Sequence, residues 1–117
     1  MYRDMGERRK FLRIRIRLPL QYKNLDQPPD SYISSISKDI SQNGVCFISH
    51  KFIPISTRMV TIVNLDYPKL SQIKAISKLA WIQKNSSAES YCMGLEFLAM
   101  TREDSHLLSK VLTANLT

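Results

Sequence analysis

The feature that most constrains the fold is a period-two alternation near the N-terminus. From Arg13 to Leu18, arginines alternate with aliphatic residues. Successive side chains of an extended chain point to opposite faces, so this pattern predicts a strand with one buried and one wet face. We expect the strand to cover residues 13–23. Pro19 lies within it and cannot donate a ladder hydrogen bond, so we expect an edge position or a bulge there.

Five further segments have strand character, and turn-forming residues separate them. They cover residues 32–40, 45–49, 58–65, 73–84 and 91–98. The first of these segments alternates imperfectly, which indicates a bulge. The period then changes to a helical spacing of apolar residues. This stripe consists of Leu107, Leu108, Val111 and Leu112. Thr101 is the expected N-cap of that helix.

Six short strands and one helix, without strand–helix alternation, predict an all-β fold with a C-terminal helix. The architecture expected is a six-stranded antiparallel β-barrel. The chain has 117 residues, of which 44% are apolar, enough for the core of one small domain. We expect residues 1–12 to form a flexible basic arm. Residues 13–117 would form the barrel domain, with the helix at about 102–114.

The net charge of +7 is concentrated at the N-terminus. Residues 1–18 contain seven Arg or Lys against two Asp or Glu, which gives +5. The remaining residues contain ten against eight, which gives +2. A general nucleic-acid-binding protein more often spreads its charge over a broad face. A local cluster fits a compact anionic ligand equally well. A solvated strand face with a basic tail is the alternative interpretation.

The apolar runs, the charged N-terminus, the cysteines and the histidines of the sequence exclude several classes of protein. The sequence contains no apolar run of about 18 residues, so we expect no transmembrane helix. The N-terminus is charged from Arg3 onward, so we expect no secretory signal and a cytoplasmic location. Cys46 and Cys92 are therefore expected to be buried thiols and not a disulfide. His50 and His106 have no neighbours at metal-ligand spacing, so no metal site is predicted.

Residues 39–44, Asp-Ile-Ser-Gln-Asn-Gly, could carry recognition chemistry. Asp39 and Ser41 point to the same side of an extended segment. A carboxylate can accept two hydrogen bonds from the N1–H and N2–H₂ edge of guanine, and a hydroxyl can donate or accept beside it. Gly44 allows a sharp turn at positive φ and a close backbone approach. An ordinary hairpin turn with a side-chain cap is the alternative interpretation.

Residues 7–13, Glu-Arg-Arg-Lys-Phe-Leu-Arg, have complementary chemistry. Arginine binds phosphate through a planar fork of two charge-assisted hydrogen bonds. It can also pair with guanine or stack on the base. Phosphate-binding and guanine-binding groups thus occur together in one small predicted barrel.

These two stretches resemble the paired motifs of PilZ domains, which are bacterial receptors for cyclic diguanylate (cyclic di-GMP). Residues 7–13 match the motif Arg-x-x-x-Arg preceded by another Arg, and residues 39–44 match Asp/Asn-x-Ser-x-x-Gly. Residues 79–82 and 93–97 resemble the fifth and sixth strands of the family, and a short helix follows in both. The resemblance covers nearly the whole chain and implies a six-stranded antiparallel barrel with a helix.

The resemblance also implies the roles of the arginines. Arg9 and Arg13 would hold the phosphates and guanine faces of cyclic di-GMP. Arg8 would add a further contact, and an arginine at this position favours an intercalated ligand dimer in the family. No role is assigned to Arg15 and Arg17.

The other site residues follow from the second motif and from one aromatic side chain. The resemblance implies that Asp39 and Ser41 read a guanine edge and that Gly44 keeps the turn open. Trp81 is the only tryptophan. It lies where some family members place an aromatic residue beside a guanine, although a core aromatic is the alternative interpretation.

The implied function is a ligand-operated switch. The arm at residues 1–12 would fold over cyclic di-GMP and change what an unidentified downstream effector protein contacts. No catalytic motif is present, so we expect a receptor without cofactor and not an enzyme. Two alternatives stay open, a PilZ-type adaptor that binds only protein and a nucleic-acid-binding small barrel. Nucleic acid is not the expected partner, because the aromatic residues fall mostly at core-like positions.

Overall fold

The computed structural model describes residues 13–66, 70–86 and 89–115. The predicted arm at residues 1–12 lies outside this range, and so do Arg8 and Arg9. The elements of the described residues are β1 (Ile14–Arg15), β2 (Pro19–Asn24), a 3₁₀ turn (Pro29–Ser31), β3 (Ile33–Ser41), β4 (Gly44–Ser49), β5 (Arg58–Asp66), β6 (Leu70–Lys84), β7 (Tyr91–Met100) and α2 (Arg102–Ala114).

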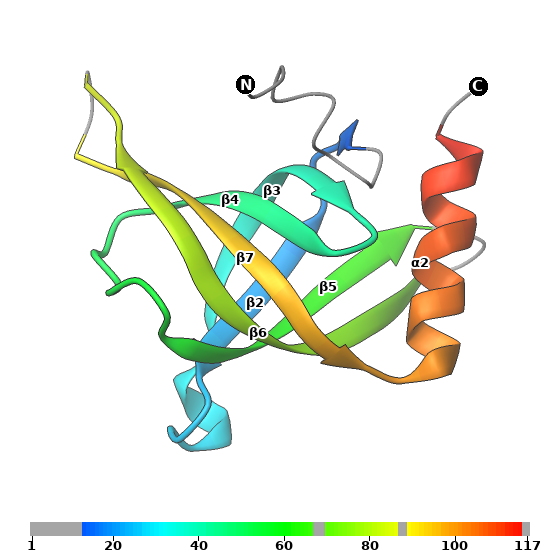
Figure 1. Ribbon diagram of the computed structural model, residues 1–117, viewed down its shortest axis with the longest axis horizontal. Helices are drawn as coiled ribbons and strands as arrows, with labels where there is room; N and C mark the ends of the chain where they lie inside the picture. Colours follow the sequence, from blue (N-terminus) through cyan, green and yellow to red (C-terminus); the bar gives the residue numbers. More distant parts are fainter. Residues whose placement is uncertain (1–12, 67–69, 87–88, 116–117) are drawn as a thin grey trace, which may run out of the picture.

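The strands form a closed antiparallel barrel (Figure 1). Neighbouring strands follow the order β3-β2-β5-β6-β7-β4, and β4 pairs with β3 to close the ring. β1 is an additional short strand that pairs with β3 beside the start of β2. The prediction of a six-stranded antiparallel barrel with a C-terminal helix is therefore confirmed.

The prediction of one continuous strand over residues 13–23 was wrong, because β1 and β2 are separate. Three residues between Arg15 and Pro19 face only two residues between Ile36 and Asp39 of β3. One extra residue in the first strand is a β-bulge. The expected bulge near Pro19 is thus present. The edge position is not, since β2 lies between β3 and β5.

A serine side chain explains where the first strand is interrupted. The Oγ atom of Ser37 donates to the carbonyl oxygen of Ile16 at 2.5 Å and accepts from the backbone nitrogen of Leu18 at 2.9 Å. A hydroxyl from β3 therefore replaces a backbone partner at this point of the ladder. Ser37 is 2% exposed, so the backbone groups it satisfies would otherwise be buried without partners.

Inward-facing apolar side chains fill the barrel. The largest of those that are fully buried are Phe47, Leu20, Ile40, Met59, Leu65, Ile73, Leu79 and Met93. The rings of Tyr22 and Phe47 pack with centroids 4.8 Å apart. The predicted helical stripe lies on α2, which covers one end of β5 and β6 (Figure 1). The helix begins as expected, because the Thr101 hydroxyl accepts a hydrogen bond from the backbone nitrogen of Asp104 at 3.1 Å.

Two further sequence predictions can be compared with the described residues. Cys46 and Cys92 are both buried and form no disulfide, which confirms the prediction of free thiols. Within the described ranges, no helix has the length and apolar character needed to cross a membrane.

Candidate functional site

Two cross-strand rows of outward-facing positions run over the barrel surface. The first row consists of Arg15, Asp39, Cys46, Gly94 and Trp81, each the register partner of the next. The second consists of Ser41, Gly44, Glu96 and Lys78. The positions between the two rows point into the core; they are Ile40, Val45, Leu95 and Leu79. Strand pairing therefore brings residues from β1, β3, β4, β7 and β6 onto one face.

A cavity of about 170 Å³ lies over these two rows. Five of the residues predicted to bind the ligand line it, namely Arg13, Asp39, Ser41, Gly44 and Trp81. The two others, Arg8 and Arg9, belong to the segment that the structure does not describe. The structure thus gathers every predicted site residue that it describes around one cavity.

Arg13, in the segment before β1, forms an ion pair with Asp39 of β3. The distance from Arg13 Nη1 to Asp39 Oδ1 is 3.5 Å, and the side chains are 38% and 23% exposed. Exposed ion pairs of this kind contribute at most about 1 kcal/mol. A ligand that offers both groups better partners can therefore displace this contact at small cost.

The hydroxyl of Ser41 takes part in the turn between β3 and β4. Its Oγ donates to Asn43 Oδ1 at 2.8 Å and accepts from the Asn43 backbone nitrogen at 3.3 Å. The turn is therefore capped by a serine side chain, as the alternative interpretation of this stretch expected. The same hydroxyl lines the cavity beside Asp39, so capping and lining occur together.

The prediction that this turn uses positive φ was wrong. Among the described residues, Ser56 at 72° is the only non-glycine residue with positive φ, and no glycine has it. Gly44 is required for a different reason. A Cβ atom on Gly44 would collide with the backbone oxygen of Leu95 on β7. The absent side chain therefore permits the close approach of β4 and β7.

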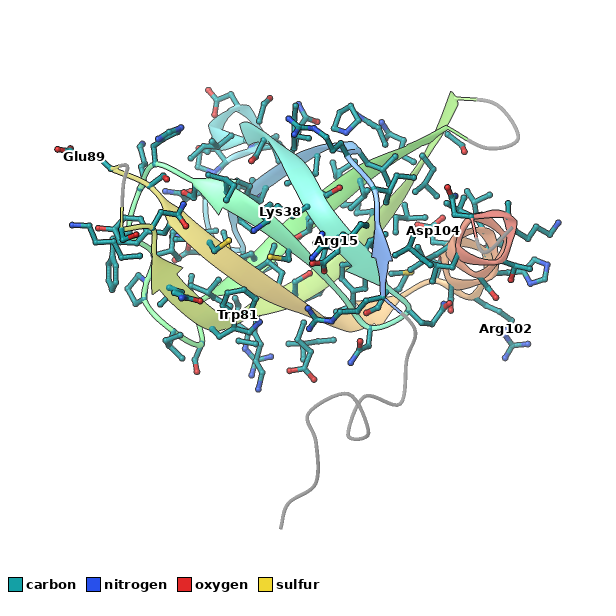
Figure 2. All side chains as sticks on the ribbon, turned by 90° about the horizontal axis from the view of Figure 1, so that it is seen from above. Arg15, Lys38, Trp81, Glu89, Arg102 and Asp104 are labelled. Carbon is teal, nitrogen blue, oxygen red and sulfur yellow. The ribbon has the colours of Figure 1, made fainter. Side chains whose placement is uncertain are left out.

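Trp81 lies on the outer face of the barrel and not in the core (Figure 2). Its half-buried indole covers Gly94, where an added Cβ atom would overlap the ring. One extra residue, Ala80, stands between Leu79 and Trp81 relative to the paired residues of β7. This bulge places Trp81 on the outer face of the barrel, whereas Leu79 points into the core. The alternative interpretation of Trp81 as a core aromatic does not hold.

Glu96 and Cys46 also line the cavity, although neither was predicted to belong to the site. Glu96 pairs with Lys78, with 3.7 Å between Oε1 and Nζ. Burial raises the pKa of the Cys46 thiol to about 12, and the Asp39 carboxylate adds to this rise. Cys46 is therefore an uncharged part of the cavity wall near neutral pH. The alternation along residues 91–98 predicts that Glu96 points away from the core. Which residues of other strands lie beside Glu96 depends on the register between the strands.

The described residues contain no cluster of three His, Cys, Asp or Glu side chains that could hold a metal ion.

Comparison with known proteins places the fold. A family model described as "PilZ domain" matches residues 7–114. A search of curated protein sequences found no match. The structure of the Bacillus subtilis inhibitor of motility (MotI/DgrA) is similar with a TM-score of 0.77 and 19% identity, over 93% of this chain and 51% of that chain.

Two further solved structures are also similar. The PilZ domain of YcgR from Escherichia coli, solved with c-di-GMP, has a TM-score of 0.66 and 15% identity over 93% of this chain and 92% of that domain. MrkH from K. pneumonia has a TM-score of 0.69 and 14% identity over 90% of this chain and 48% of that chain. This chain therefore spans about half the length of MotI and MrkH. At these identities the similarity concerns the fold alone.

Proposed function

We propose that this chain, which belongs to the PilZ domain family, is a receptor for cyclic di-GMP and not an enzyme. The observation that carries the proposal is the convergence of Arg13, Asp39, Ser41 and Trp81 on one cavity. These residues come from two different strands, β3 and β6, and from the segment before β1. The solved PilZ domain of YcgR with c-di-GMP supports the choice of ligand.

The barrel face supplies groups suited to a guanine base. The Asp39 carboxylate can accept from the N1–H and N2–H₂ groups, and the Ser41 hydroxyl lies two residues along the same face. The indole of Trp81 offers an apolar surface to the base. The guanidinium of Arg13 can bind a phosphate or the O6 and N7 atoms of guanine. Together these groups would hold one guanine and its nearest phosphate.

The charges around the cavity imply a second contribution from the arm. The charged residues of the lining are one cation, Arg13, and two anions, Asp39 and Glu96. Cyclic di-GMP carries two phosphodiester groups and is a dianion. We infer that the barrel recognises the base, while Arg8 and Arg9 neutralise the phosphates. Neutralisation of the phosphates by Arg8 and Arg9 would favour folding of the arm over the bound ligand.

Substitution of Arg9 by alanine is expected to weaken cyclic di-GMP binding. Loss of one charge-assisted contact costs on the order of 1.5–3 kcal/mol. Isothermal titration calorimetry measures this cost together with the stoichiometry. Lys10→Ala is the matched control, because it removes the same charge from the neighbouring position outside the motif. Equal affinities of wild type and Arg9→Ala would contradict the role of Arg9. A wild-type chain that does not bind at all would favour the protein-binding adaptor instead.

Ordering of the arm is the second part of the proposal. A short basic segment that closes over a multivalent anion changes the surface that an effector protein contacts. Saturating cyclic di-GMP should therefore slow amide hydrogen exchange in residues 5–13, which hydrogen-exchange mass spectrometry detects. Unchanged exchange in this segment, at ligand concentrations that calorimetry shows to be saturating, would refute the switch but not the receptor.

A further inference from the structure

Two β-bulges meet on the outer face of the barrel beside the ligand cavity. The first lies between β1 and β2, in the segment that contains Arg17. The second lies on the other side of β3, where Lys38 separates Ser37 from Asp39 while their β4 partners are consecutive. Bulges re-aim side chains and occur often beside functional sites. Here both bulged segments present an exposed cation, since Arg17 and Lys38 are solvent-exposed.

These cations line two hollows that share residues. A hollow of about 470 Å³ is lined by Arg15, Ile16, Arg17, Ser37, Lys38 and Asp39. A second, of about 320 Å³, shares Arg17, Ser37 and Lys38 and adds Ile36, Ile48 and His50 among others. We call the two together the basic groove. Figure 2 labels Arg15 and Lys38 close to one another over β1 and β3.

The charges of the basic groove have few partners of their own. Among the described residues, neither Arg15 nor Arg17 has an ion pair or a side-chain hydrogen bond. Lys38 Nζ donates to Cys92 Sγ at 3.3 Å, and this hydrogen bond raises the pKa of Lys38, which stays charged at neutral pH. The acidic residue of the lining, Asp39, is paired with Arg13. The groove is therefore cationic and accessible.

We propose that the basic groove binds an extended acidic segment of a partner protein. Acidic side chains would bind Arg15, Arg17 and Lys38 through charge-assisted hydrogen bonds. Ile36, which is 45% exposed, and half-buried Ile48 provide an apolar surface for the side chains between them. A peptide with alternating acidic and apolar residues matches this arrangement, because successive side chains of an extended chain point to opposite sides.

The lining favours a peptide over single-stranded nucleic acid. Nucleic acid binding without sequence preference uses exposed aromatic rings on which bases stack. The one Phe, Tyr or Trp ring that lines the groove, that of Tyr22, is 2% exposed, and its hydroxyl is 3.2 Å from Ser49 Oγ. The exposed ring of the lining is the imidazole of His50, the smallest aromatic ring among the side chains, so a base would find little stacking surface in the groove. The chain beyond residue 18 carries a net charge of only +2, so a long polyanion would also find few further cations.

The proposal that the groove binds an acidic peptide depends on the proposed receptor function in one respect only. Asp39 lines both the basic groove and the ligand cavity, so a receptor could report its ligand to a partner bound next to it. Peptide binding itself requires no cyclic di-GMP. It is therefore measured without the dinucleotide, and its failure is distinguishable from failure of the receptor proposal.

The test is fluorescence anisotropy with a labelled synthetic peptide of alternating glutamate and leucine, at low salt. The variant Arg17→Gln/Lys38→Gln is expected to bind roughly tenfold more weakly or worse than wild type, from the loss of charged contacts. Arg102→Gln/Lys110→Gln is the matched control, because it removes the same two charges from exposed positions of α2. This control should bind like wild type. Added salt should weaken the wild-type complex by screening.

Several results would overturn the proposal. They are absence of wild-type binding, equal binding of a lysine–leucine peptide of the same length, and displacement of the peptide by an oligothymidylate at equal or lower charge concentration. If Arg17→Gln/Lys38→Gln does not fold, the variant Arg15→Gln/Arg17→Gln decides instead, because both residues are exposed. Unweakened peptide binding by the folded variant would also refute the groove.

Discussion

Replacement of Asp39 by asparagine is expected to weaken cyclic di-GMP binding by roughly a hundredfold or more. The carboxylate can accept two hydrogen bonds from one guanine edge, each worth on the order of 1.5–3 kcal/mol when charge-assisted, and about 1.4 kcal/mol corresponds to a factor of ten. Asparagine keeps the shape but offers one acceptor oxygen. Its amide group would place donors against the donors of guanine.

Calorimetry on purified Asp39→Asn measures this effect. Asp26→Asn is the control, since it removes the same charge from an exposed loop residue. The barrel should keep its stability, because the ion pair of Asp39 with Arg13 is partly exposed. An Asp39→Asn variant that binds as tightly as wild type would show that this carboxylate does not read the base.

Truncation of Phe47 to alanine is expected to lower the free energy of unfolding by about 3–5 kcal/mol. Its side chain is 0% exposed and its ring packs against Tyr22, so truncation leaves a cavity inside the barrel. Small domains have a total stability of roughly 5–15 kcal/mol, so this loss is a large fraction of it. Urea denaturation followed by far-UV circular dichroism measures the change.

Phe52 provides the same chemical change at the surface. Its side chain is 62% exposed, and its ring contact is an edge-on approach to Tyr91 with centroids 5.9 Å apart. Phe52→Ala should therefore lower the free energy of unfolding by about 1 kcal/mol or less. Similar losses of unfolding free energy for Phe47→Ala and Phe52→Ala would contradict the orientation of β4. In that orientation Phe47 points into the core and Cys46 points toward the cavity.

The strands and the helix could be predicted because their periods are local properties of the sequence. The interruption between β1 and β2 could not, because its cause is the hydroxyl of Ser37 on another strand. Trp81 illustrates the same limit. Strict alternation puts Trp81 on the buried face of Leu79, and only the bulge at Ala80 reverses it. Contacts between strands decide both cases, and local periodicity carries no information about them.

The candidate site was predictable to the extent that its residues share one strand or one motif. Asp39 and Ser41 lie on the same face because they are two residues apart on β3. The position of Glu96 beside Gly44 depends on the register between β4 and β7. Gly44 itself was identified for a partly wrong reason. Its need for space comes from the backbone of β7 and not from its own φ angle.

Closure of the barrel also bears on how the protein behaves at high concentration. Open sheet edges are templates for pairing with other chains and hence for aggregation. Pairing of β3 with β4 leaves β1 as the terminal strand of the described sheet, and β1 is two residues long. Arg15 and the neighbouring Arg13 add positive charge at this short edge. The arginines that flank the ligand cavity therefore also discourage edge-to-edge association between copies of the chain.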